Sequence, residues 1–354
     1  MKHDSILASN LERLSNISSP AGQEWSTCDI LKLIFSEYCN EVQVDSFFNV
    51  SGYRKGCGQK PRKIAVMAHA DEIGMMVVSI DKNGFLYFSA VGGIDPSVLL
   101  AQEVVIHGKK DIFGVIGAKP PHLLGEEERN KTLDIKNLCI DTGFTCDKIK
   151  ELVSIGDYIT FRPAFGSLHN SRVYGKALDN RAGVAALIEA MRMCADEKHE
   201  DDIYFIATAQ EEFHMAGANK VLYDLCPDIA VILDACHGVI DDESQEDFFP
   251  LGRGPAIGVG PVLDKNLSRF LIDLCKEHAI PFQIDVEHYD TGTEAWTSQV
   301  SRDGIPTCLI SVPVRYMHTP CETMDLNDLS NTARLVYNFI SKFHNIDLNN
   351  YFYK

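Results

Sequence analysis

The sequence predicts an α/β fold: a mostly parallel sheet with helices on both faces, into which a small β-rich barrel or sandwich is inserted. Three observations predict it. After residue 163, apolar runs typical of buried strands alternate with helix-length amphipathic segments. Residues 74–161 show short alternating strands separated by turn signals instead. The 45% hydrophobic and 23% charged composition is that of an ordinary globular protein and excludes a disordered or collagen-like chain.

The first part of the chain predicts two helices and one buried strand. Apolar residues recur at helical spacing over residues 5–18, a Ser-Pro-Ala-Gly break follows, and a second helix is expected from about residue 24 to 39. Residues 63–69 form a short apolar run between polar segments, which indicates a buried strand. We place the inserted β-rich domain at residues 72–163, so the α/β domain comprises residues 1–71 and 164–354.

The alternation of strands and helices resumes after the insertion. Strands are expected over residues 203–209, 229–234, 282–286 and 307–312, and helices over residues 180–194, 216–225, 266–278, 293–302 and 325–343. Strands that alternate with helices of this length predict a mostly parallel sheet covered on both faces.

The charge balance excludes several classes of partner. Fifty Asp and Glu residues against 33 Lys and Arg give a formal net charge of −17. Such a surface repels phosphate backbones and anionic lipids, so neither nucleic acid nor a membrane is expected as a partner. The N-terminus lacks the layout of a signal peptide, and the 11 cysteines occur without a C-x-x-C pair. We therefore expect a cytoplasmic protein with reduced thiols.

Polar clusters follow several of the predicted strands, at the sheet edge where open α/β sheets bind ligands. The first is His69-Ala-Asp71-Glu72, directly after the strand at residues 63–69. In such a segment the histidine can bind a metal while the nearby carboxylate holds its other ring nitrogen. Alternatively, the histidine and the aspartate form a purely structural pair whose members bind each other and no metal.

Two further clusters contribute carboxylates. Asp179 precedes an amphipathic helix, where it is either the helix N-cap or a carboxylate whose two oxygens bridge two cations. Glu211 and Glu212 follow the strand at residues 203–209. Adjacent carboxylates repel each other unless a cation neutralises one and a proton resides on the other, which suits one metal ligand and one general base. A solvated acidic turn is the alternative.

The last two clusters complete a metal-binding set. Asp234 ends the strand at residues 229–234, where it could also be an ordinary turn residue, and His318 lies just past the strand at residues 307–312. The set contains two imidazoles and three carboxylates: His69, Asp179, Glu212, Asp234 and His318. It predicts a pair of divalent cations that lower the pKa of a water and polarise a carbonyl. Zinc and cobalt suit these ligands best, and manganese is also compatible.

The order of these clusters resembles that of a known family. The runs that match are His69-Ala-Asp71-Glu72, Lys176-Ala-Leu-Asp179-Asn-Arg181, Gln210-Glu211-Glu212, Gly252-Arg-Gly-Pro-Ala-Ile-Gly-Val-Gly-Pro261 and Arg315-Tyr-Met-His318-Thr-Pro320. The chain is similar to the tetrahedral aminopeptidases and the glutamyl, or deblocking, aminopeptidases, which are dinuclear metallopeptidases. The similarity extends from the first helix to about Asp328. It implies a zinc-peptidase-like α/β fold.

The resemblance also implies the ligand arrangement. Asp179 would bridge both metals, His69 and Asp234 would complete one site, and Glu212 and His318 would complete the other. The implied reaction is removal of N-terminal residues from short peptides.

Two further roles and an assembly follow from the same resemblance. Glu211 would be the general base that takes a proton from water, and Asp71 would orient His69. The inserted domain would take part in assembling dimers into a homo-oligomer of twelve subunits.

The sequence departs from the family pattern at two places. Ala-Cys-His-Gly follows Asp234 where relatives commonly have a Thr-His-Ala run, and Glu294 stands where an aspartate is usual. Neither change removes an expected ligand. The roles of Glu294, His237 and His122 stay open, as do the preferred N-terminal residue and the native metal.

Two alternative functions remain to be tested. A metal-free glycoside hydrolase of the endoglucanase type needs two carboxylates at a set separation and leaves the histidines without a role. An inactive metal-binding assembly would not require Glu211, yet every expected ligand and the base are present.

Overall fold

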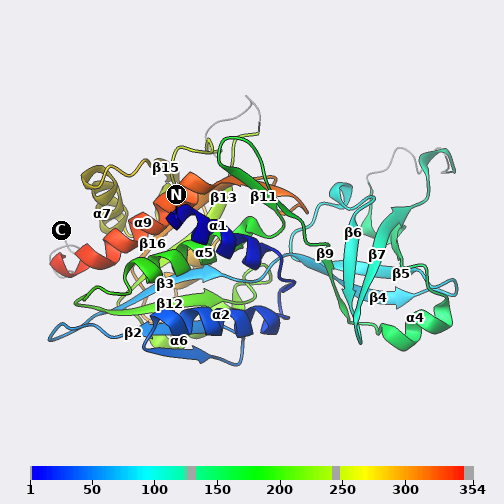
Figure 1. Ribbon diagram of the computed structural model, residues 1–354, viewed down its shortest axis with the longest axis horizontal. Coiled ribbons are helices and arrows are strands. Elements are labelled where there is room, and N and C mark those ends of the chain that lie inside the picture. The colour runs from blue at the N-terminus through cyan, green and yellow to red at the C-terminus, as the bar shows by residue number, and fades with distance from the viewer. Residues whose placement is uncertain (1, 124, 126–132, 241–247, 347–354) are drawn as a thin grey trace.

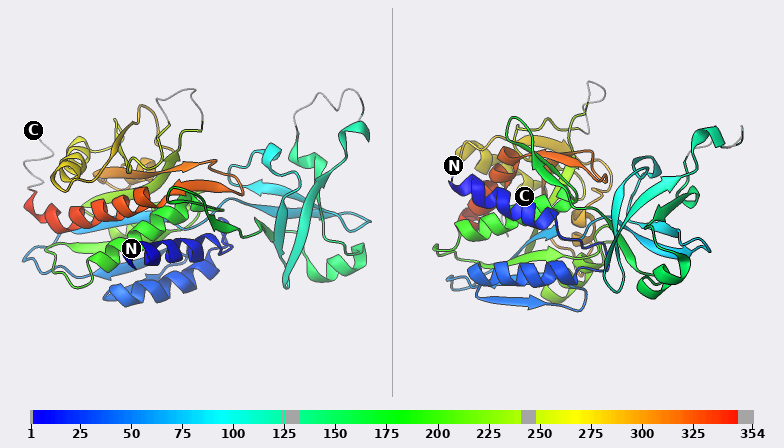
Figure 2. Two further views of the ribbon diagram at one scale, coloured as in Figure 1. Left: turned by 45° about the horizontal axis from the view of Figure 1, so that its top comes forward. Right: turned by 45° about the vertical axis from the view of Figure 1, so that its right-hand side comes forward.

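The computed structural model describes residues 2–123, 125, 133–240 and 248–346, and it confirms the predicted α/β class (Figure 1). The larger body is an 11-stranded sheet with helices on both faces, and a closed six-stranded barrel projects from one side of it (Figures 1 and 2). None of the helices in the described ranges is long and apolar enough to cross a lipid bilayer.

The large sheet has a parallel centre. Its strands are β1 (Glu41–Val44), β2 (Val50–Arg54), β3 (Lys63–His69), β10 (Phe165–Ser167), β11 (Arg172–Gly175), β12 (Asp202–Thr208), β13 (Ile229–His237), β14 (Ala256–Val259), β15 (Gln283–Val286), β16 (Thr307–Arg315) and β17 (Glu322–Asp325). The main order is β1-β2-β12-β3-β13-β16-β17-β11-β10. Parallel pairing joins the four central strands β12, β3, β13 and β16, and also β14 with β15, whereas the outer strands pair antiparallel.

Helices cover both faces of this sheet because its central strands are apolar on both sides. The helices are α1 (Lys2–Ser15), α2 (Trp25–Tyr38), α5 (Leu178–Met193), α6 (Ala216–Leu225), α7 (Lys265–Glu277), α8 (Glu294–Ser298) and α9 (Leu326–Lys342). In β3, Ile64 and Val66 join the core formed with α1, α2, α5, α7 and α9, whereas Ala65 and Met67 pack with α6 and α8. The continuous apolar run of β3 therefore reflects burial on both faces.

The β-rich segment forms a barrel with a hydrophobic core of its own. Its strands are β4 (Gly74–Ile80), β5 (Leu86–Val91), β6 (Glu103–His107), β7 (Asp111–Ala118), β8 (Leu138–Asp141) and β9 (Tyr158–Phe161), closed in the order β4-β5-β8-β7-β6-β9. The helix α4 (Cys146–Leu152) packs Ile149 into this core. Full closure removes the exposed strand edges that an open sheet of this size would leave.

Some element boundaries differ from the sequence-based expectation. The strand expected to end at residue 234 continues to His237, because it stays paired with β16 as far as Val314. The helix expected over residues 293–302 ends at Ser298, and Arg302 takes a left-handed conformation (φ 51°) in the turn that follows. All 11 cysteines are free, as the spacing predicts.

A buried ion pair joins the segments that lead into the site. Glu72, between β3 and β4, accepts a 2.6 Å hydrogen bond from Lys176, which precedes α5, and both side chains are at most 2% exposed. Glu72 also accepts the backbone N–H of Ser19, and the Lys176 ammonium donates to the carbonyl of Ile17. The N-terminal segment is thereby fixed against the residues that precede Asp179.

Candidate metal centre

The sheet topology brings three predicted clusters to one edge. β12, β3 and β13 are adjacent and parallel, with Thr208 of β12 opposite His69 of β3. The ends of neighbouring parallel strands lie at the same edge of a sheet, so the turn with Glu211 and Glu212 and the side chain of Asp234 flank His69. The β16 strand extends the same edge, and His318 lies three residues beyond its end.

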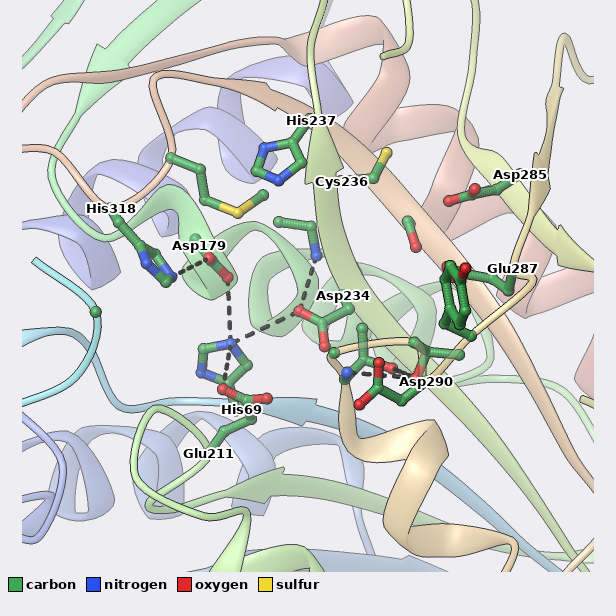
Figure 3. A pocket seen from close by; sticks show the side chains of 18 of the residues that line it. His69, Asp179, Glu211, Asp234, Cys236, His237, Asp285, Glu287, Asp290 and His318 are labelled. Carbon is green, nitrogen blue, oxygen red and sulfur yellow. Dashed lines mark hydrogen bonds and ion pairs between the residues drawn. The ribbon is translucent and has the colours of Figure 1, made fainter. Parts of the chain in front are cut away.

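Asp179 lies between the two histidines, with one oxygen facing each. The distance from His69 Nε2 to Asp179 Oδ1 is 3.2 Å, and from His318 Nε2 to Asp179 Oδ2 it is 3.5 Å (Figure 3). His69 Nε2 is also 3.6 Å from Asp234 Oδ1, and His318 Nε2 is 3.5 Å from Glu212 Oε2. The five expected ligands thus form two groups that share the Asp179 carboxylate.

The local backbone shows that Asp179 is not the N-cap of α5. Asn180, one residue further on, accepts the N–H of Gly183 with its side-chain oxygen at 2.9 Å, which is the bond expected of an N-cap. Asp179 itself is non-helical (φ −79°, ψ 109°), although it falls within the bounds of α5. Its carboxylate is therefore left to face the histidines.

The donor set fits a cation. His69, Asp179 and Glu212 offer ligand atoms that all lie within 4.8 Å of one another. Asp234 is 4% exposed, and its Oδ2 atom is buried without a hydrogen-bond partner. A buried carboxylate oxygen without a donor is costly unless a cation or a proton neutralises it. Imidazole and carboxylate ligands together suit zinc, cobalt or manganese.

Buried acceptors behind the centre hold the backbone of the expected ligands. Asp71 accepts the N–H groups of Glu211 and Glu212, one with each oxygen and both at 3.0 Å. The Asp71 Oδ1 atom also lies 3.5 Å from His69 Nδ1. Asp71 therefore holds the turn of the two glutamates as well as facing the His69 ring.

Glu322, at the start of β17, likewise accepts backbone N–H groups on the other side of the centre. It accepts the N–H of Asp179 and the N–H of His318, each at 2.9 Å, and it is 2% exposed. The sequence contains Glu322 in the same cluster as His318, but nothing in its spacing distinguishes it from a solvated residue.

Sequence reasoning missed two further acceptors. Glu24, just before α2, accepts the N–H of Gln210 at 3.0 Å, and Asn49 accepts the N–H of Ala209 at 2.9 Å. Gln210 needs this support because its backbone is left-handed (φ 58°) without being glycine. Glu24 is far from Gln210 in sequence, and the only signal for it is a glutamate two residues after the Pro-Ala-Gly break.

Burial and mutual repulsion shift the protonation of this cluster. Burial, with the charge of Asp234 adding to it, raises the pKa of Glu211 to about 9, and burial likewise raises the pKa of Asp234 to about 8. Burial and the charge of Asp179 raise the pKa of Glu212. Burial opposes ionisation of Asp179, yet hydrogen bonds from His318 and His69 lower its pKa.

The His69 imidazole responds to the same charges. Burial favours its neutral form, but the carboxylate of Glu211, the hydrogen bond to Asp179 and the nearby carboxylate of Asp71 raise the pKa of His69 well above its usual value. The cluster therefore retains protons that a bound cation would displace.

The centre forms one end of a cavity of about 690 Å³. His237 and Cys236 line it above Asp234 (Figure 3). The rings of His237 and Phe248 are tilted by 32° with their centroids 5.6 Å apart. Gly93 lies against His318, and a Cβ atom there would come within 2.9 Å of the ring nitrogen Nδ1.

The other two residues left open by the sequence lie outside the cavity wall. Glu294 is 1% exposed in the first turn of α8, and burial raises its pKa to about 7. His122 is exposed in the short 3₁₀ helix Pro121–Leu123 that follows β7.

A comparison with protein families identifies the family of this chain. Residues 49–335 match the M42 glutamyl aminopeptidase family. The chain belongs to this family. A lysyl aminopeptidase from Pyrococcus furiosus is 33% identical over 87% of this chain and 88% of its own length. The match supports peptide aminopeptidase activity, which is a hydrolase reaction.

Solved structures agree with this assignment. A TET aminopeptidase from a marine sediment Thaumarchaeota archaeon superposes with a TM-score of 0.91 at 31% identity, covering 98% of each chain. The TET1 peptidase of Pyrococcus horikoshii, which can assemble into a tetrahedron or a large octahedral shell, has a TM-score of 0.82 at 29% identity over 94% of this chain and 99% of its own. A Thermotoga maritima protein described as an endoglucanase has a TM-score of 0.77 at 31% identity over 94% and 97%.

Replacement of Glu24 tests whether it positions the turn with Glu211. In Glu24→Gln the amide oxygen can still accept the Gln210 N–H, so we expect most of the activity on aminoacyl p-nitroanilides to remain. Glu24→Ala leaves that N–H without an acceptor, and kcat should fall roughly tenfold to a hundredfold, as for other small displacements of catalytic groups. Equal loss in both variants, or none in Glu24→Ala, would contradict the positioning role.

The raised pKa values predict a pH dependence of stability. Glu211 and Asp234 hold protons in the folded state that the unfolded chain releases near pH 4 to 5, so folding binds protons. The melting temperature of chelator-treated protein should therefore fall between about pH 6 and about pH 8.5. Bound metal displaces these protons, so the gain in melting temperature on adding zinc should be larger at about pH 8.5. A melting temperature that rises with pH in the chelated protein would contradict this.

Proposed function

We propose that the protein is a metal-dependent aminopeptidase that removes N-terminal residues from short peptides with two divalent cations and a glutamate base. The observation that carries the proposal is the position of Asp179, whose two oxygens face His69 and His318 separately. In this proposal His69 and Asp234 hold one cation, Glu212 and His318 hold the other, and Asp179 is shared.

The cations would polarise the scissile carbonyl and make a water molecule a better nucleophile at neutral pH. Glu211 accepts the proton of that water and later delivers it to the leaving amine. Its Oε2 atom lies 3.9 Å from His69 Nε2, and its side chain is 10% exposed at the cavity. Bound cations would displace the proton that burial holds on Glu211 in the metal-free chain, so that its carboxylate can accept the proton of the water.

Asp71 supports this chemistry without contacting the substrate. It faces the Nδ1 atom of His69 and thereby favours the tautomer in which Nε2 is free to bind a cation. Its bonds to the N–H groups of Glu211 and Glu212 set the direction in which the base and the ligand point.

The endoglucanase alternative makes the opposite prediction about metals. A retaining or inverting glycosidase uses two carboxyl groups and no cation, so a chelator would leave it active. Loss of peptide hydrolysis after chelation and its recovery with cobalt, zinc or manganese would exclude that alternative. Absence of hydrolysis with every metal would favour the inactive metal-binding assembly.

Two substitutions separate the base from the ligands. Glu211→Gln should keep both metals, measured by inductively coupled plasma mass spectrometry, while kcat falls by roughly a hundredfold to ten-thousandfold. His318→Ala, the matched variant, should lose metal as well as activity. Retained activity in Glu211→Gln, or full metal content in His318→Ala, would refute the assigned role.

We also propose that twelve copies assemble from dimers, with the barrel of residues 72–163 at the contacts. The TET neighbours support a homo-oligomer. The barrel exposes large apolar side chains, including Phe113 at 65% and Val115 at 47%, as expected of a surface that another copy covers. Light scattering should give about twelve times the 39.4 kDa of one chain, and a monomeric mass would contradict the proposal.

A further inference from the structure

We infer that Arg181 is a positioning residue for the turn that carries Glu211. Its buried guanidinium serves as the counter-charge of Asp71 and Glu24, the two carboxylates that hold this turn, and ordered water joins it to Glu24. Arg181 does not touch the substrate. Its effect on turnover rests on the proposed aminopeptidase function, whereas the buried charge cluster and its water do not.

Arg181 is completely buried, yet several of its donors lack a partner. The side chain is 0% exposed and is among the largest in the core. Its Nη1 atom donates to the hydroxyl of Thr27 at 3.1 Å. Within the described part of the chain, neither Nε nor Nη2 has a hydrogen-bond partner. A buried cation with unsatisfied donors is costly, so a polar acceptor or water must lie against it.

The bond to Thr27 places the guanidinium beside Glu24. Both helices involved, α2 and α5, share one hydrophobic core on the same face of the sheet (Figure 1). Glu24 directly precedes α2, and Thr27 lies three residues further on in its first turn, so the two side chains lie on one side of the helix. Glu24 Oε1 accepts the N–H groups of Gly22 and Gln210, but Oε2 is buried without a partner among the described residues.

Three carboxylates act on the charge of Arg181. Burial lowers the pKa of the guanidinium, and the carboxylates of Glu72, Asp71 and Glu24 counteract this effect. Glu72 is already bonded through both oxygens to the ammonium of Lys176, at 2.6 and 2.8 Å. The guanidinium is therefore left to balance Asp71 and Glu24.

These two carboxylates hold the turn of the proposed base. Asp71 accepts the N–H groups of Glu211 and Glu212. Glu24 accepts the N–H of Gln210. Burial and the charge of Asp71 raise the pKa of Glu24 to about 7, so burial already disfavours the charge of this acceptor. Loss of the guanidinium would leave both carboxylates buried without compensation, and the turn that they hold would shift.

A crystal structure at a resolution that shows water tests the link to Glu24. Buried water occupies places where it can bond to several otherwise unsatisfied polar groups, and Arg181 Nε, Arg181 Nη2 and Glu24 Oε2 are such groups. Ordered water should lie within about 2.7–3.2 Å of the guanidinium and of Glu24 Oε2. Absence of water there, or a direct bond from the guanidinium to Glu24, would overturn the inference.

Single variants test the positioning role. In metal-loaded Arg181→Met, kcat on aminoacyl p-nitroanilides should fall roughly tenfold to a hundredfold with little change in KM, as for other small displacements of catalytic groups. Arg181→Lys keeps the charge and should retain more of the activity.

Arg54→Met is the matched control. Arg54 is also buried, but its guanidinium donates to backbone carbonyl groups, and it pairs with Ile203 at the start of β12, away from the edge that carries the site. This variant should lower the melting temperature and leave kcat unchanged. An equal loss of kcat in Arg54→Met and Arg181→Met would overturn the inference.

A double variant separates lost charge balance from lost packing. Glu24→Gln keeps an oxygen that can accept the Gln210 N–H but removes one buried negative charge. Combined with Arg181→Met, it should raise kcat about tenfold over Arg181→Met alone, with a higher melting temperature. Losses that simply add would overturn the inference. If Arg181→Met does not fold, a folded double variant is the same rescue, and its failure to fold would overturn the inference.

Failure of the proposed function is distinguishable from failure of this inference. Absence of hydrolysis by the unaltered protein with every metal would refute the proposed function. The buried water and the melting temperatures of the same variants would still decide whether Arg181 is the counter-charge of Asp71 and Glu24.

Discussion

The structure depends on keeping several carboxylates together at the ends of the central parallel strands. Glu211, Glu212, Asp179 and Asp234 converge on His69 where burial disfavours their charge. Left to themselves they would repel one another and retain protons, as the raised pKa values of Glu211 and Asp234 indicate. The surrounding fold must therefore hold them in place, and bound cations, two in the function that we propose, would neutralise them.

Backbone N–H groups provide much of that restraint. Asp71, Glu322 and Glu24 are buried carboxylates, yet each accepts backbone N–H groups of the segments that carry the ligands or the base. Loss of such a buried acceptor would leave the N–H group without a partner, so these hydrogen bonds hold the segments in place. The buried Lys176–Glu72 pair extends the same network to the N-terminal segment. The proposed base and ligands thus share one scaffold, and we therefore expect a residue as remote in sequence as Glu24 to affect catalysis.

The sequence predicts the fold class because segments with the period of a strand alternate clearly with segments of helical period. It also predicts most of the polar clusters of the candidate site, because these follow apolar strands. It cannot predict the antiparallel outer strands or the continuation of β13 to His237, since these depend on pairing with distant partners. The sequence also leaves open whether Asp179 is a helix cap or a bridging carboxylate. The bond from Gly183 to Asn180 and the two histidines that face Asp179 decide between these interpretations. Glu24 carries no local motif, because tertiary packing alone brings its side chain to the N–H of Gln210.

Anomalous diffraction from crystals of the zinc-loaded protein tests the central claim most directly. The account predicts two peaks about 3.5–4 Å apart on either side of Asp179, the separation typical of two-metal sites. One should contact His69 and Asp234, and the other Glu212 and His318. A single peak, or two peaks that do not share Asp179, would contradict the account.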